Sequence, residues 1–91
     1  MRLICVVFVL FLALITSAQS QQTATDWFNK GVDLYGQSKY DEAINAFDEA
    51  IKIDPNLAEA WNNKGLVLKV LGRTTEADAA FAKTKELQDG K

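Results

Sequence analysis

The chain has 91 residues, enough for one small domain, and carries 10 basic and 12 acidic residues for a net charge of −2. It contains no histidine and a single cysteine, which excludes zinc sites built on those residues and nucleophiles activated by histidine. The charges are scattered, without the basic patch that nucleic-acid binding requires, so we expect no nucleic-acid partner.

The N-terminal segment has the order of a secretory signal peptide. A short basic start is followed by an unbroken apolar run of thirteen residues, Leu3 to Ile15, and then by small residues. We expect cleavage after Ala18, with a cut after Ser20 as the second option. An uncleaved membrane anchor is the alternative, although a spanning helix needs about 20 apolar residues and this run is shorter.

Removal of residues 1–18 takes Arg2 and Cys5 away and leaves nine basic and twelve acidic residues, a net charge of −3. The mature chain then has no thiol, and we expect it to be secreted or extracytoplasmic, without membrane contact. Residues 19–23 read QSQQT and are predicted to be a short polar leader.

From residue 24 onward the chain repeats itself after 34 residues, with ten identities in one ungapped register. A fixed period of this length is typical of stacked supersecondary units. The identical positions of the first copy are Ala24, Trp27, Asn29, Lys30, Gly31, Leu34, Glu42, Ala43, Ala46 and Phe47, and those of the second are Ala58, Trp61, Asn63, Lys64, Gly65, Leu68, Glu76, Ala77, Ala80 and Phe81.

In the first copy we expect one helix over 24–37 and a second over 40–53, because apolar residues recur at helical spacing. Ser38 followed by Asp41 predicts a side-chain cap at the start of the second helix. Asp54-Pro55 ends that helix, since proline disfavours helical geometry in the residue before it.

In the second copy we expect helices over 58–71 and 75–87. Asn56 followed by Glu59 predicts the cap of the first of these helices. Gly72 suits the tight turn between them, and Gly90 suits the C-terminal cap.

Gly31 and Gly65 are expected to let the second helix of each hairpin approach closely, since a glycine inside a helix otherwise costs about 1 kcal/mol against alanine. Ala43 and Ala77 are the predicted small partners across that contact. The tryptophans are interpreted as wedges between the two helices rather than as ligand-stacking platforms. The predicted buried set is Trp27, Gly31, Ala43, Phe47, Trp61, Gly65, Ala77 and Phe81.

The chain resembles the tetratricopeptide repeat family over 24–57 and 58–91. The family pattern is matched in the first copy by Trp27, Gly31, Tyr40, Ala43, Phe47, Ala50 and Pro55, and in the second by Trp61, Gly65, Gly72, Ala77 and Phe81. Lys30 and Lys64 stand where the family has leucine, and their stems can still cover apolar surface. The resemblance implies an all-α fold of two tandem hairpins, a fragment of a right-handed superhelix whose first helices line a groove for a peptide or protein partner.

By the same resemblance, the groove is lined by Phe28, Asn29, Val32, Tyr35, Asn62, Asn63, Leu66 and Lys69. Phe28, Val32 and Tyr35 have i, i+4, i+7 spacing and form one apolar stripe, and the asparagine amides can both donate to and accept from a peptide backbone. Some family members clamp a C-terminal carboxylate here, but only Asn63 matches that pattern, so we do not expect such a clamp. Alternatively, Phe28 and Val32 only shield the first hairpin.

No catalytic motif is present, and no cofactor or metal is expected. The remaining candidates are carboxylates on faces expected to be solvated, which are ordinary surface charges; they are Asp41, Glu42, Asp48, Glu49, Glu76 and Asp78. The sequence therefore indicates that the protein is not an enzyme.

The outer face of the last helix differs between the copies. Tyr40, Ile44 and Ile51 of the first copy correspond to Thr74, Asp78 and Lys85 in the second, and a polar outer face is what a terminal repeat needs. We therefore expect the stack to end here. The leading hypothesis is an exported peptide- or protein-binding scaffold, monomeric or weakly self-associating. A self-associating adaptor and a membrane-tethered accessory subunit are the alternatives.

Overall fold

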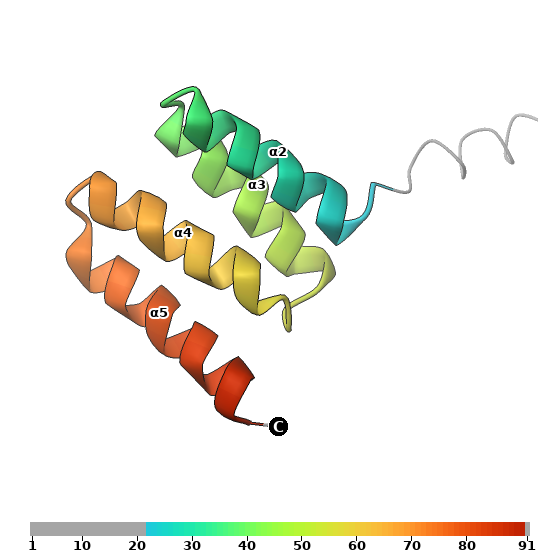
Figure 1. Ribbon diagram of the computed structural model, residues 1–91, viewed down its shortest axis with the longest axis vertical. Coiled ribbons are helices and arrows are strands. Elements are labelled where there is room, and N and C mark those ends of the chain that lie inside the picture. The colour runs from blue at the N-terminus through green and yellow to red at the C-terminus, as the bar shows by residue number, and fades with distance from the viewer. Residues whose placement is uncertain (1–21, 91) are drawn as a thin grey trace, which may run out of the picture.

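The computed structural model describes residues 22–90, which form two antiparallel helical hairpins (Figure 1). The first hairpin joins α2 (Ala24–Gly36) to α3 (Tyr40–Ile53), and the second joins α4 (Ala58–Val70) to α5 (Thr74–Asp89). The predicted all-α, two-hairpin fold is confirmed, with every helix end within one or two residues of its expected position. The predicted signal peptide lies outside the described residues, as does most of the leader.

The two hairpins lie side by side and meet mainly through α3 and α4. A smaller contact joins α2 to α4. The first helices of the two hairpins are therefore neighbours on one side of the stack.

Thr23, which the sequence assigned to the polar leader, is the N-cap of α2. Its hydroxyl accepts from the Asp26 backbone N–H at 3.1 Å, and the Asp26 carboxylate accepts from the Thr23 N–H at 3.1 Å. This reciprocal pair is a capping box, which satisfies two backbone donors at the helix start.

The predicted caps at Ser38 and Asn56 are wrong. The N-caps of α3 and α4 are Lys39 and Leu57, and neither makes a side-chain capping bond. Ser38 instead has a φ of 62°, and the next residue donates its N–H to the Leu34 carbonyl at 2.9 Å. The left-handed conformation of Ser38 closes the end of α2. Because its backbone takes this conformation, Ser38 does not act as the N-cap of α3.

A left-handed turn closes α4 in the same way at Gly72, with φ at 79° and a bond from Arg73 N–H to the Leu68 carbonyl of 2.9 Å. The predicted tight turn at Gly72 is thus confirmed. Asn56 has a different role from the one predicted, since its backbone N–H donates to the Asp54 carboxylate at 3.1 Å. Gly90 is the C-cap of α5, as expected.

The glycines inside α2 and α4 lie against phenylalanine rings rather than against alanines. A Cβ on Gly31 would lie 2.5 Å from the Phe47 ring, and one on Gly65 would lie 2.6 Å from the Phe81 ring. The expected close approach is therefore present, but the partner assignment was wrong. Ala43 and Ala77 are fully buried beside these contacts.

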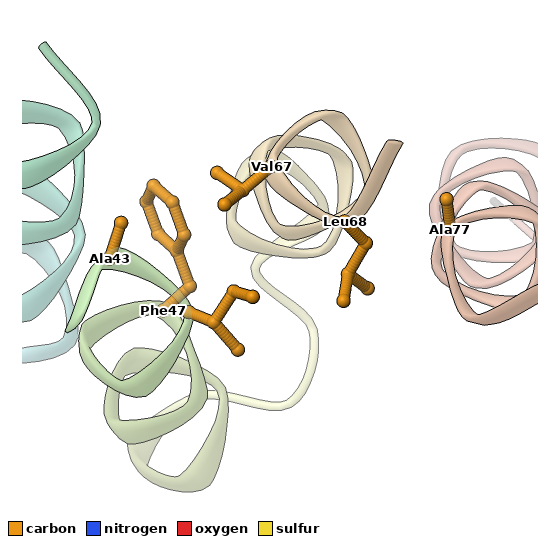
Figure 2. Packing of buried hydrophobic residues seen from close by; sticks show 6 residues of the cluster. Ala43, Phe47, Val67, Leu68 and Ala77 are labelled. Carbon is orange, nitrogen blue, oxygen red and sulfur yellow. The ribbon is translucent and has the colours of Figure 1, made fainter. Parts of the chain in front are cut away.

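The predicted core is only partly correct. Gly31, Ala43, Phe47, Gly65 and Ala77 are buried, but Trp27, Trp61 and Phe81 are half-buried. Val67 of the second hairpin covers the Phe47 ring (Figure 2), whereas no third hairpin covers Phe81 in the described part of the chain.

Both tryptophans lie at the surface with a lysine above them. The Lys30 ammonium is 4.9 Å from the Trp27 ring, and the Lys64 ammonium is 5.7 Å from the Trp61 ring. The indole N–H of Trp61 donates to the Pro55 carbonyl at 3.0 Å, which ties α4 to the turn before it. An indole with one polar contact and one apolar face is stable at such a half-buried site.

Ile44, Phe47 and Val67 form the apolar contact between the hairpins, and an ion pair of 2.7 Å between Asp48 and Lys64 crosses the same junction. The equivalent stripe on α5, formed by Thr74, Asp78 and Lys85, is exposed throughout, as the sequence predicts. The outer face of α2, at the other end of the stack, is polar too. Asp26 and Asp33 are exposed there, at the positions that correspond to buried Ala60 and Val67 in α4.

Candidate functional site

All eight predicted groove residues come from α2 and α4, the two helices that are neighbours on one side of the stack. Six of them line two adjoining hollows, one apolar and one polar. Asn29 and Lys69 line neither of these two, although both are exposed.

The apolar hollow lies between the C-terminal halves of α2 and α4 and has a volume of about 200 Å³. Its walls are Val32, Tyr35, Asn63 and Leu66, and its floor includes the buried Phe47 and Val67. A cavity of about 150 Å³ can hold a benzene molecule, so this hollow can take one bulky side chain.

Exposed apolar side chains line this hollow. Of the six large apolar side chains that are exposed in residues 22–90, three line it, namely Val32, Tyr35 and Leu66, with exposed fractions of 39–42%. Exposed apolar side chains that share one surface are typical of an interaction site. Val70, at the end of α4, and its C-cap Leu71 are also exposed.

The polar hollow adjoins the first one at Asn63 and has a volume of about 390 Å³. It lies near the N-terminal end of α4, and its lining consists of Phe28, Ala58, Glu59, Asn62, Asn63, Thr84 and Gln88. The last two belong to α5 and were missed, because groove positions were assigned only to the first helix of each hairpin. Thr84 is buried and donates to the Ala80 carbonyl at 3.0 Å.

The repeat pattern is matched by two family models. One, described as TPR repeat, matches residues 31–72, and the other, described as tetratricopeptide repeat, matches residues 58–89. The chain belongs to the tetratricopeptide repeat family. Its repeats place it among protein-interaction scaffolds, which are typically non-catalytic.

Individual relatives match part of this chain. An uncharacterized protein of Methanocaldococcus jannaschii is 36% identical over 55 residues, which is 60% of this chain and 64% of that protein. The mouse protein O-mannosyl-transferase TMTC1 is 31% identical over 61 residues, 67% of this chain but 6% of that protein. The STIP1 homolog of Dictyostelium discoideum is 28% identical over 71 residues, 78% of this chain and 13% of that protein.

Phe28 lies between the core and the groove of this tetratricopeptide repeat chain. Its ring centroid lies 5.8 Å from that of Phe47 at a tilt of 49°, and the side chain is half-buried against the core. Phe28 also lines the polar hollow. Phe28 therefore both packs and lines the groove, whereas Val32 is 42% exposed and belongs to the apolar hollow.

The two hollows offer groups for non-covalent contacts. Among residues 22–90, no group of acidic, histidine or cysteine side chains could hold a metal ion. In the same part of the chain, no helix is both long enough and apolar enough to cross a membrane. The lining residues offer apolar contact, amide hydrogen bonds from Asn62 and Asn63, and the single carboxylate of Glu59.

Within residues 22–90, one acid–base pair has shifted pKa values, and it lies at the start of α5. Arg73 donates to both Glu76 carboxylate oxygens, at 2.9 and 2.6 Å. These hydrogen bonds lower the pKa of Glu76 and raise the pKa of Arg73. Glu76 carries an acidic charge in the first turn of a helix, where the macrodipole favours it, so the pair is structural.

Proposed function

We propose that the chain is an exported binding module that receives a segment of a protein or peptide partner in the groove between α2 and α4. The observation that carries this proposal is the apolar hollow of about 200 Å³, with Val32, Tyr35 and Leu66 exposed around its mouth. Apolar walls exposed to water raise the free energy of the protein, and a partner that covers them lowers it.

The proposal contains no catalytic step. The chain spans 64% of the archaeal relative and only small parts of the two longer ones, so the transferase activity in one printed name is not carried over. The absence of histidine from the whole chain supports the same view, since the commonest general base is missing.

Export rests on the sequence of residues 1–18 alone, whose removal would leave a chain outside the cytoplasm. The membrane-tethered alternative depends on the same residues, so one measurement of the mature N-terminus distinguishes the two.

A self-associating adaptor is the second candidate, and the exposed charges at both ends of the stack weigh against it. If a second copy stacked on α5 as α4 stacks on α3, its Asp33 would take the place of Val67, against Asp78 and Lys85 in place of Ile44 and Ile51. Such a contact would bury charge where the junction between the two hairpins buries apolar surface, and the desolvation of charged groups is costly even when they pair.

A substitution in the groove tests the proposal. Leu66→Asp places a carboxylate at the mouth of the apolar hollow, and Ile53→Asp makes the same kind of change at an equally exposed residue elsewhere, with 42% and 50% exposure. The protein should be purified with its partner from the exported fraction, and the melting temperature of each variant recorded.

We expect Leu66→Asp to lose the partner while Ile53→Asp keeps it, with similar melting temperatures. Retention of the partner by Leu66→Asp, or equal loss by both variants, would contradict recognition in this groove.

A further inference from the structure

The groove carries opposite charges at its two ends. Glu59 lies in the first turn of α4 and lines the polar hollow, and Lys69 lies in the last turn of the same helix. Glu59, Asn62, Leu66 and Lys69 share one stripe of α4 by their spacing. A rise of 1.5 Å per residue separates the two charged residues by about 15 Å along the helix, with the apolar hollow between them.

Both charges are available to a partner. In the described part of the chain, the four ion pairs use Lys52, Lys64, Arg73 and Lys83, and none of them includes Glu59 or Lys69. An acid at the start of a helix and a base at its end also stabilise the helix itself. That local role is the alternative explanation, and it predicts an effect on stability but none on the choice of ligand.

The two hollows are spaced like side chains of an extended peptide. The α4 residues that line the polar hollow are 58, 59, 62 and 63, and those that line the apolar hollow are 63, 66 and 67, so the centres of the two sets are about 7 Å apart along the helix. An extended chain advances about 3.3 Å per residue, so about two residues of a bound peptide would span this distance.

We propose that the groove selects a partner segment with one bulky apolar side chain between an acidic and a basic residue. The apolar side chain fills the hollow beside Leu66, the basic residue lies about two positions away at Glu59, and the acidic residue lies on the other side, at Lys69. The inference rests on the proposed function, because it concerns the same groove. It adds that the flanking charges decide which segments bind.

Short peptides with blocked ends test this charge selection. The comparison of their affinities does not depend on the direction in which a peptide lies in the groove. The probes are Ac-Asp-Leu-Ser-Lys-NH2, with mixed charges, Ac-Asp-Leu-Ser-Asp-NH2 and Ac-Lys-Leu-Ser-Lys-NH2. Each is titrated at low ionic strength into the protein in the form that accumulates on export, and the backbone amide signals of Asn63 and Leu66 are followed by NMR. Solvent-exposed ion pairs are weak, so we expect the mixed peptide to bind about two- to fivefold more tightly than the others.

Charge reversal should change the preference in a defined way. With Glu59→Lys both ends of the groove are basic, and the peptide with two aspartates should bind best. With Lys69→Glu both ends are acidic, and the peptide with two lysines should bind best. Asp78→Lys is the matched control, since it changes the net charge as Glu59→Lys does but lies on the exposed outer stripe of α5. It should keep the preference for the mixed peptide.

The outcomes separate this inference from the proposed function. If all leucine peptides shift the groove signals equally in every variant, the groove binds apolar side chains and charge selection is wrong. If Asp78→Lys also comes to prefer the peptide with two aspartates, the effect is one of net charge only, and the inference is overturned. Ac-Asp-Ala-Ser-Lys-NH2 should bind at least about tenfold more weakly than the leucine peptide, because burial of the apolar side chain is lost. If no peptide shifts the signals, the inference fails, while the proposed function is still decided by the Leu66→Asp experiment.

Discussion

The Phe47 ring occupies the space where a side chain on Gly31 would begin, with its nearest carbon 2.5 Å from the ideal Cβ position. Val67 and Ile44 belong to the same buried cluster, so the ring is held from the side of the second hairpin as well. This contact joins α2, α3 and α4 at one point. It explains why the chain has a glycine inside α2 in spite of its poor helix propensity.

We expect Gly31→Ala to destabilise the fold by about 1–3 kcal/mol, because the added methyl group overpacks a ring that cannot move away. Gly36→Ala is the matched control, since a Cβ there meets nothing within 4 Å, and it should be neutral or stabilising. Gly65→Ala should be less damaging than Gly31→Ala, because the Phe81 ring is only half-buried. Thermal and urea unfolding measure all three, and equal effects of Gly31→Ala and Gly36→Ala would show that the contact is misassigned.

Ser38 and Gly72 occupy the same position in the two hairpins, and both have positive φ, at 62° and 79°. A residue with a Cβ pays a penalty of about 1–2 kcal/mol in this region, whereas glycine does not. Ser38→Gly should therefore stabilise the protein, and Gly72→Ser should destabilise it by a similar amount. Urea unfolding measures the change in the free energy of unfolding for each variant. A destabilising Ser38→Gly or a stabilising Gly72→Ser would contradict the left-handed turn at that site.

The polar stripe on α5 should keep the stack from growing. Replacing Thr74, Asp78 and Lys85 with Tyr, Ile and Ile copies the apolar stripe that α3 presents to α4, so the variant should associate. Solution mass from light scattering measures this at several concentrations. A variant that stays as monomeric as the parent would mean that the stripe on α5 is not a stacking face.

The Arg73–Glu76 pair predicts a small, acid-dependent contribution to stability. The pKa of Glu76 is lowered in the folded protein, so its contribution is present above the unfolded pKa and is lost as the pH falls through the folded value. Glu76→Gln should therefore reduce stability at neutral pH and cease to matter in strong acid. The effect should shrink with added salt, because the pair is exposed. An identical deficit at all pH values would rule out the ion pair as its cause.

Removal of Met1 to Ala18 remains a prediction from the sequence. Intact-mass measurement of the exported protein should find a chain that begins at Gln19, or at Gln21 if the cut follows Ser20. A mature product that still carries the apolar run would support the membrane-tethered alternative.

The sequence by itself determined the hairpins and their order. The 34-residue period, the helical spacing of apolar residues and the Asp54-Pro55 break are local signals, and local signals set where helices begin and end. The outward stripe of Thr74, Asp78 and Lys85 was also readable, because comparison of the two copies shows which apolar positions have been lost.

Only the tertiary structure decided which residues meet. The partner of Gly31 is a ring sixteen residues away rather than the expected alanine, because helix packing brings together side chains whose directions spacing alone does not specify. Ser38 ends one helix instead of capping the next, since the backbone has to reverse before a cap can form. The two hollows, the shared position of Asn63 and the contribution of Thr84 and Gln88 depend on how α2, α4 and α5 lie together, which no single helix encodes.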